Sequence, residues 1–306
     1  MTATLGTLAA CNVNGSAIHG LQGSSVDPGI VAQALASDGY ESPTRVLLAD
    51  QQPAADFDSS ALDTLLALNS SKFAYEGVAL SGNGFEGFFA TLSADGGRAS
   101  TGTQFAVANG LLIPVSLVVP HDGPGTITSR VIGRSSDGAT VPIAVSTGQS
   151  LPAYAAHNEY SAGPCEYNGT AIDKVQRVQV DFNIRVEVLQ GDGDIYSDTV
   201  VRMSAQPMIT ISTLDVAIAN AIGIGGVRQG ETDSDIYLRK WDVAGNRVAT
   251  GSAVHIKLSI QGNNSLIYPA AVRASQHAIG GVDVIYSPIF DGTNPVITVA
   301  TTSAIS

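Results

Sequence analysis

The chain has 306 residues, of which 44% are hydrophobic and 14% are charged, and its formal net charge is −12 at pH 7. A chain of this length and composition can bury a substantial core, which excludes a largely disordered protein. The acidic balance argues against nucleic-acid binding, because phosphate recognition needs clustered Lys and Arg, and the 15 present are spread along the sequence.

Residues 8–11 look like a lipoprotein cleavage site, but no Lys or Arg precedes them and Gly6 interrupts the short stretch before Cys11. We therefore expect no secretion signal and synthesis in the cytoplasm. No run of about 18 apolar residues occurs, so we expect no membrane anchor. Cys11 and Cys165, the two cysteines, form no metal or disulfide pattern, and we expect both thiols to be buried and inert.

Short β-rich segments separated by turn residues run through the whole chain. Asp-Gly pairs, typical of turns, begin at Asp38, Asp95, Asp122, Asp137, Asp192 and Asp291. Strands are expected over residues 45–48, 88–92, 111–119, 126–132, 141–145, 195–203, 208–212, 236–239, 253–260, 282–286 and 296–301. Because helices do not alternate with these strands, the sequence predicts a mainly β fold, an antiparallel β-sandwich or barrel with one or two short helices.

The best helix pattern covers residues 60–68, where Asp58 or Ser59 is the expected N-cap and Asn69 ends the helix. Its apolar face should close one end of the sheet core. A second short helix is expected over residues 214–222, with Thr213 as its cap and Gly223 after its last turn.

The clearest pattern is the strict alternation of apolar and polar residues over 175–188. It predicts one long β-strand with a wet face, suited to a large antiparallel sheet, a barrel wall or an arm that reaches a neighbouring subunit. One interpretation is an ordinary solvated sheet face. The other interpretation is that this face lines the channel of a ring, through which DNA passes without binding to the wall. The polar face consists of Gln179, Asp181, Asn183, Arg185 and Glu187.

Two glycine-rich segments resemble ligand loops but are better explained as turns. Residues 82–87 have the spacing of a dinucleotide-binding loop, yet a strand follows them where a helix would be required, which favours a hairpin tip. Residues 190–194, with Asp198 nearby, offer carboxylates to Ca²⁺ but lack a complete ligand series. This segment joins two expected strands, so a hairpin turn accounts for it, and we expect no metal or other cofactor.

The sequence contains no recognisable catalytic motif. The five histidines lie in different segments without zinc-ligand spacing, and His255 is expected on the polar face of a surface strand. No Gly-x-Ser-x-Gly pentapeptide is present, so we expect a protein that is not an enzyme. Trp241 with Tyr237 is compatible with a sugar-stacking platform, although an aromatic at a strand end more commonly packs at the edge of the core.

Several stretches resemble the structural proteins of tailed bacteriophages. Residues 13–30 are similar to the start of tail-tube-like proteins, and residues 37–44 and 56–66 continue that likeness. Residues 287–299 resemble the closing strands of phage virion proteins. The resemblance is to the tail tube (major tail protein) family.

This resemblance implies a virion tail subunit that assembles with itself into rings, as hexamers, stacks them through extended arms and encloses a DNA-conducting channel. Other tail proteins, such as a tape-measure or terminator protein, are then its partners, and DNA only passes through. The alternatives are a capsid or decoration protein, or a sugar- or receptor-binding virion module that uses Tyr237 and Trp241.

We expect residues 1–306 to form a single β-rich assembly subunit. The chain is longer than a minimal tube fold, so an additional loop or small β domain must be accommodated. If a boundary exists, the glycine-rich residues 223–230 are its expected place, leaving a small C-terminal β domain over 231–306.

Overall fold

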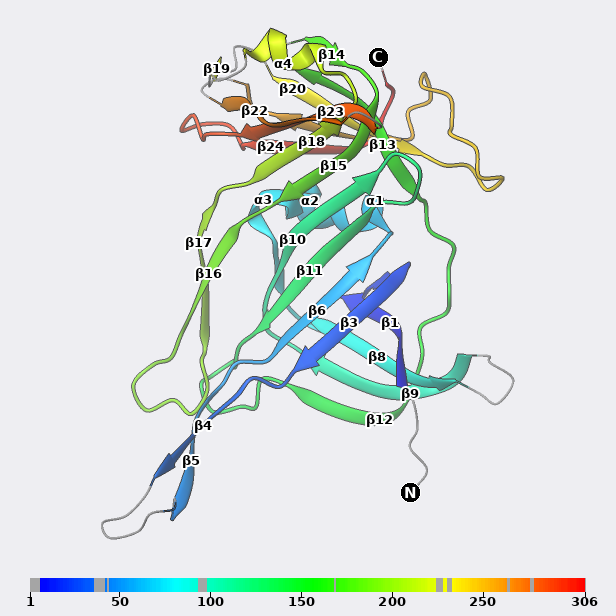
Figure 1. Cartoon of the computed structure of the whole chain (residues 1–306). Helices are drawn as coiled ribbons and strands as arrows, with labels where there is room; N and C mark the ends of the chain where they lie inside the picture. Colours follow the sequence, from blue (N-terminus) through cyan, green and yellow to red (C-terminus); the bar gives the residue numbers. More distant parts are fainter. Residues whose placement is uncertain are drawn as a thin grey trace.

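The computed structural model describes residues 6–35, 42, 44–92, 98–167, 169–223, 228–229, 233–262, 265–275 and 278–305. The predicted mainly β fold is confirmed, since antiparallel sheets build the described part of the molecule and the four helices in that part are short (Figure 1). The expected turns at Asp38 and Asp95, His277 and most of residues 223–230 lie outside the described residues.

A ten-stranded sheet forms the centre of the molecule, and all its strand pairs are antiparallel. Short alternating segments that are apolar on one face explain why this sheet has one buried side. In spatial order its strands are β19 (Arg228–Gln229), β22 (Leu266–Ser275), β23 (Ala278–Ser287), β18 (Met208–Thr213), β15 (Val175–Asp181), β10 (Gly110–Pro120), β11 (Thr126–Gly133), β6 (Ala54–Ser59) and β3 (Leu21–Asp27), with β7 (Val78–Leu80) beside β10.

Two five-stranded sheets pack against different parts of this central sheet, at the bottom and the top of Figure 1. The lower sheet consists of β12 (Ala144–Ser150), β9 (Arg98–Val107), β8 (Phe85–Leu92), β1 (Gly6–Val13) and β2 (Ser16–Ile18). The upper sheet consists of β14 (Thr170–Ile172), β13 (Tyr160–Tyr167), β20 (Ser234–Lys240), β21 (His255–Ile260) and β24 (Ile297–Ser303).

Apolar side chains from all three sheets form one continuous core. Phe57 of β6 stacks on Phe85 of β8 with ring centroids 5.8 Å apart, which joins the central and lower sheets. Tyr286 of β23 is buried and its hydroxyl donates to the Glu166 carbonyl of β13 at 3.1 Å, which joins the central and upper sheets. The molecule is therefore layered in the manner of a β-sandwich.

The predicted helix over 60–68 is shorter than expected. It forms α1 (Leu62–Leu66), and two single turns follow, α2 (Leu68–Ser71) and α3 (Phe73–Glu76). Ser59 accepts the Ala61 N–H at 3.1 Å, whereas the alternative cap Asp58 lies in β6. The end near Asn69 has a clear cause: Asn69 and Ser70 adopt positive φ, and the Asn69 side chain donates to the Gly77 carbonyl.

The second predicted helix is also shorter, because capping shifts its start. Thr213 Oγ1 accepts the Asp215 N–H, and the Asp215 carboxylate in turn accepts the Ala217 N–H, so α4 covers Ala217–Ile222. It ends before Gly223 as expected, with Gly223 at a φ of 96°.

The single long strand predicted over 175–188 is wrong. It is divided into β15 and β16 (Ile184–Leu189) by a kink at Asn183, where φ is 47°. Phe182 is buried and its N–H donates to Val115, so β15 stays in the central sheet while β16 leaves it. β16 pairs with β17 (Thr199–Ala205), and we call this hairpin the strap because it runs down one side of the molecule (Figure 1).

A second two-stranded hairpin projects from the body at the lower left of Figure 1. It consists of β4 (Ile30–Leu35) and β5 (Arg45–Gln51), which pair only with each other among the described strands. We call it the arm. The sequence predicted only part of β5 as a strand.

The strands after residue 231 share sheets with strands that precede them. β20 pairs with β13, and β23 pairs with β18. Any C-terminal unit over 231–306 would therefore share its sheets with the rest of the chain. The division into domains stays a prediction.

Candidate functional site

One face of the central sheet is polar across six neighbouring strands. The registers place Asp58 opposite Thr128, Thr128 opposite Ser116 and Ser116 opposite Asp181, and residues in register share a face. The residues between them along each strand are buried on the other side of the sheet. We call this surface the polar face: Asp56, Asp58, Thr128, Arg130, Ser116, Arg177, Gln179, Asp181, Thr210, Ser212 and Asp283.

Hydrogen bonds between side chains hold the polar face in a fixed arrangement. Thr128 donates to Asp58 at 2.6 Å, and the Gln179 amide donates to both carboxylate oxygens of Asp181 at 3.1 and 3.0 Å. Arg130 donates to both oxygens of Asp56 at 2.7 and 3.0 Å, and this partner raises the pKa of the guanidinium. Aspartates outnumber arginines on this surface, so it is acidic.

The predicted polar face of the long strand is therefore only partly brought together. Gln179 and Asp181 lie on the central sheet. Asn183 is at the kink, where its side chain donates to the Gln206 carbonyl at 3.1 Å. Arg185 and Glu187 lie on the strap as an exposed ion pair, 3.5 Å apart. Sequence alternation continued through residue 183, so the pattern alone gave no sign of the kink.

The arm carries an unusual amount of exposed apolar surface. Val46 is 66% exposed and Ile30 is 61% exposed, and Val31, Leu47 and Leu48 are each at least 45% exposed. Successive strand residues point to opposite faces, so Val46 and Leu47 place apolar side chains on both faces of the hairpin. An isolated two-stranded hairpin is at best marginally stable in water. The arm has the properties of a segment that is buried in an assembly.

The strap is held at its far end by Asp50, at the base of the arm. The Asp50 carboxylate accepts the Ser197 N–H at 2.9 Å and the Ser197 hydroxyl at 2.7 Å, as well as donors of Gln51 and Gln52. Burial raises the pKa of Asp50, but these hydrogen bonds outweigh burial and hold that pKa below its usual value. The sequence pattern gave no sign of this network.

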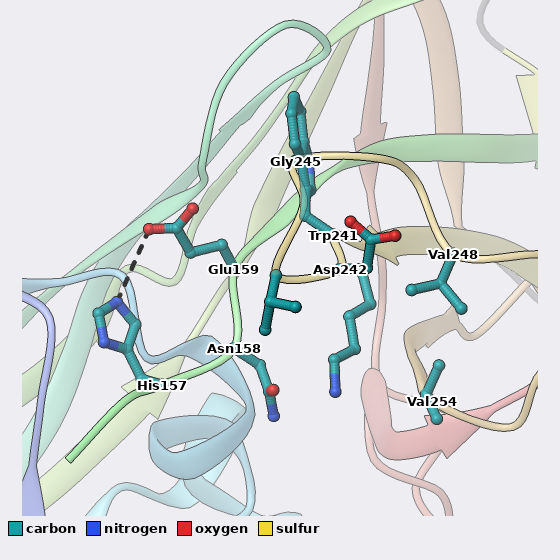
Figure 2. Close-up of a pocket in the computed structure, with 10 residues that line it drawn as sticks. His157, Asn158, Glu159, Trp241, Asp242, Gly245, Val248 and Val254 are labelled. Atoms are coloured by element: carbon teal, nitrogen blue, oxygen red, sulfur yellow. Dashed lines mark ion pairs between the residues drawn. The ribbon is translucent and has the colours of Figure 1, made fainter.

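A pocket of about 630 Å³ lies beside Trp241, between residues 157–159 and the loop that follows β20 (Figure 2). The backbone N–H of Trp241 donates to the Glu159 carbonyl at 2.9 Å, and this bond holds the two segments together. Asp242 accepts the N–H groups of Ala244 and Asn246 at 2.9 and 2.8 Å. The bond from Asn246 is the largest cause lowering the pKa of Asp242.

Tyr237, the second residue of the predicted sugar platform, does not line this pocket. It is 3% exposed, and Lys257 lies over its ring at 5.8 Å from the centroid. Instead, His157, Asn158 and Glu159 join Trp241 at the pocket. They form a run of polar residues in a segment without strand pattern, and this run is the sequence signal that marks the second wall of the pocket.

The prediction that His255 is a surface histidine is wrong. Its side chain is fully buried, Nδ1 accepts the Lys240 N–H at 3.1 Å and Nε2 donates to the Ala249 carbonyl at 3.0 Å. The ring therefore serves as the hydrogen-bond partner of the Lys240 N–H and the Ala249 carbonyl, where β20 ends. This role requires a buried side chain, although the alternation of apolar and polar residues in β21 places position 255 on the polar face.

One serine–histidine pair has a distance found in hydrolases. Ser60 Oγ lies 2.8 Å from His157 Nε2, but Glu159 also approaches Nε2, at 4.0 Å. His157 Nδ1 is buried without a partner among the described residues, so no carboxylate orients the ring from the opposite side. This arrangement does not meet the geometry of a catalytic triad.

The segments that resembled ligand loops are turns. Residues 82–84 join β7 to β8, which belong to different sheets, so this is not the tip of a hairpin as predicted. Residues 190–198 join the two strands of the strap, as predicted, and Asp194 accepts the Gly191 N–H there. In the described part of the chain, no group of three or more His, Cys, Asp or Glu residues is placed to hold a metal ion.

Comparison of the chain with protein-family models and with curated proteins finds no match. None of the described helices is long and apolar enough to cross a membrane.

Proposed function

We propose that the chain is a virion structural protein of a tailed bacteriophage, a tail tube subunit that assembles with itself into stacked rings around a DNA-conducting channel. The arm is the observation that carries this proposal. Its exposed apolar side chains and its two outer strand edges, which pair with no other described strand, are suited to a neighbouring copy that would cover both.

The polar face supports the same function. A channel that conducts DNA needs a wall that stays hydrated and does not bind phosphate, and an acidic surface rich in hydroxyl and amide groups meets both needs. The face extends over six strands of one rigid sheet, and its side chains are fixed by hydrogen bonds. Low overall charge also reduces the desolvation cost of large subunit contacts.

Negative-stain electron microscopy of the purified protein over a concentration series tests the proposal. We expect rings or stacked tubes that become more numerous as the concentration rises, since association follows mass action. Closed shells or isolated trimers would instead support a capsid or decoration protein. Monomers at every concentration would contradict self-assembly through the arm.

Two arm variants make this test specific. Val46→Asp and Leu48→Asp place charges on exposed positions, so the monomer should fold normally while the assemblies disappear. Thr147→Asp in β12 is the matched control, because it adds the same charge at an exposed position of another sheet. Assemblies that persist in both arm variants would show that the arm does not make the contact.

A further inference from the structure

The Trp241 pocket has the size and the lining of a small-molecule site. Its volume of about 630 Å³ lies within the range of ligand pockets. An aromatic ring, three valines and several polar side chains line it, and Figure 2 shows them on two facing segments. An aromatic wall suits the flat apolar face of a sugar ring, while neighbouring carboxylate and amide oxygens accept hydrogen bonds from its hydroxyls.

Two rings that line the pocket carry unsatisfied nitrogens. The indole N–H of Trp241 and Nδ1 of His157 are both buried and have no partner among the described residues. Ser60 Oγ lies within hydrogen-bond distance of both the Gly20 carbonyl oxygen, at 3.3 Å, and His157 Nε2, at 2.8 Å. The unpartnered indole N–H is a hydrogen-bond donor, and a sugar hydroxyl is a suitable acceptor for it.

The charged groups at the pocket are also available. The Lys240 ammonium has no partner among the described residues, and the nearest ion-pair partner of Glu159 is a histidine nitrogen 4.0 Å away. The Asn158 amide donates to Asp63 at 2.6 Å, on the side of the strand pair away from Trp241. Two carboxylates and one ammonium line the pocket of a chain with net charge −12, so an anionic ligand is disfavoured.

We propose that this pocket binds a neutral sugar ring, with Trp241 as the stacking surface and Glu159, the residue opposite Trp241 in the strand pair and on the same side of it, as the hydrogen-bonding group. The site is independent of the arm and the polar face. A tail subunit with such a site would contact a carbohydrate surface in addition to building the tube.

Trp241 is the only tryptophan of the chain, so its fluorescence reports on this pocket alone. Titration of the purified protein with neutral methyl glycosides should change the emission in a saturable way at millimolar concentrations, typical of single sugar rings. Calorimetry should detect the same binding. A neutral polysaccharide that ends in the preferred sugar, titrated in parallel, distinguishes a free sugar from a surface glycan as the source of the ring.

Substitutions then assign the binding to the pocket. Trp241→Ala should weaken binding measured by calorimetry by at least about tenfold, and Trp241→Phe, which keeps a ring but loses the N–H, should weaken it less. Phe290→Ala is the matched control, an exposed aromatic that does not line this pocket, and it should leave affinity unchanged.

Absence of saturable binding by the wild-type protein for every neutral sugar would overturn the proposal. Binding of charged amino sugars alone, or affinity that is unchanged in Trp241→Ala, would do the same. Electron microscopy of these variants separates the two proposals, because loss of sugar binding should leave rings and tubes intact.

Discussion

Asp50 is a buried carboxylate whose hydrogen bonds connect two hairpins that are far apart in the sequence. It is 8% exposed and accepts four hydrogen bonds, two of them from Ser197. These bonds favour the charged form and hold its pKa below the usual value despite burial. A lowered pKa means that the carboxylate stabilises the fold above the unfolded-state pKa of about 3.9, and that this stabilisation is lost as pH falls through the folded-state pKa.

We expect Asp50→Asn to lower the free energy of unfolding at pH 7 by about 1–3 kcal/mol, because the amide cannot accept the bonds of Gln52 and the Ser197 hydroxyl at its nitrogen. Its stability should also depend less on pH below about 4 than that of the wild type. Urea unfolding from pH 3 to pH 7 measures both effects. Asp192→Asn is the control, because Asp192 is an exposed aspartate in the connection that also contains Ser197. An equal loss of stability in this variant would contradict the special role of Asp50.

The two cysteines were expected to be buried and inert, and burial is confirmed because both are fully inaccessible. Desolvation raises the pKa of Cys11, and desolvation followed by the nearby Glu166 raises that of Cys165. A thiol with a raised pKa forms little thiolate, which is the nucleophilic form. We expect a thiol reagent to modify neither cysteine in the native protein at pH 8 and both in urea. Rapid labelling of the native protein, followed by mass spectrometry, would show that the core opens locally.

Among the elements, the strap illustrates how one residue redirects a strand. Asn183 adopts a left-handed backbone conformation, which asparagine tolerates better than β-branched residues do. The alternation on either side of it is uninterrupted, so the sequence predicted one strand where the chain forms two. The alternation places Asn183 on the polar face, although asparagine is also a residue type that is compatible with a bend.

We expect Asn183→Val to destabilise the protein by about 1–2 kcal/mol more than Asn183→Gly, because valine is strained at positive φ whereas glycine is not. Both variants lose the bond to the Gln206 carbonyl, so their difference isolates the backbone cost. Urea unfolding gives both free energies. Equal losses would indicate that the chain straightens at this position without cost.

For the whole molecule, the wet face predicted for one strand proved to be part of a surface that extends over six strands. Sequence alternation identified Gln179 and Asp181, but only the strand registers bring Asp58, Thr128 and Asp283 beside them, and strand order is not encoded in local periodicity. The mainly β class followed from turn residues and alternating segments. The pocket at Trp241 was foreseen only through its aromatic residue, because its other wall comes from a segment 82 residues earlier.

If the polar face lines a channel, its acidic character should prevent DNA retention. We expect the double variant Asp181→Lys with Asp283→Lys to make assembled protein retain double-stranded DNA at low salt and release it at high salt. Filter binding over a salt series measures this. Glu187→Lys with Asp192→Lys is the control, since it changes the net charge equally at positions outside the polar face. Equal retention of DNA by both double variants would show that the overall charge of the protein, and not the polar face, causes the retention.

The contact between Asp50 and Ser197 has a mechanical consequence. A pull on the arm reaches Asp50 at the end of β5, and from there the tip of the strap through two short hydrogen bonds. The strap leads directly into β15 and β18 of the central sheet. Tension on the arm is therefore transmitted along the backbone to the middle of the molecule and does not end at the hinge of a loose hairpin.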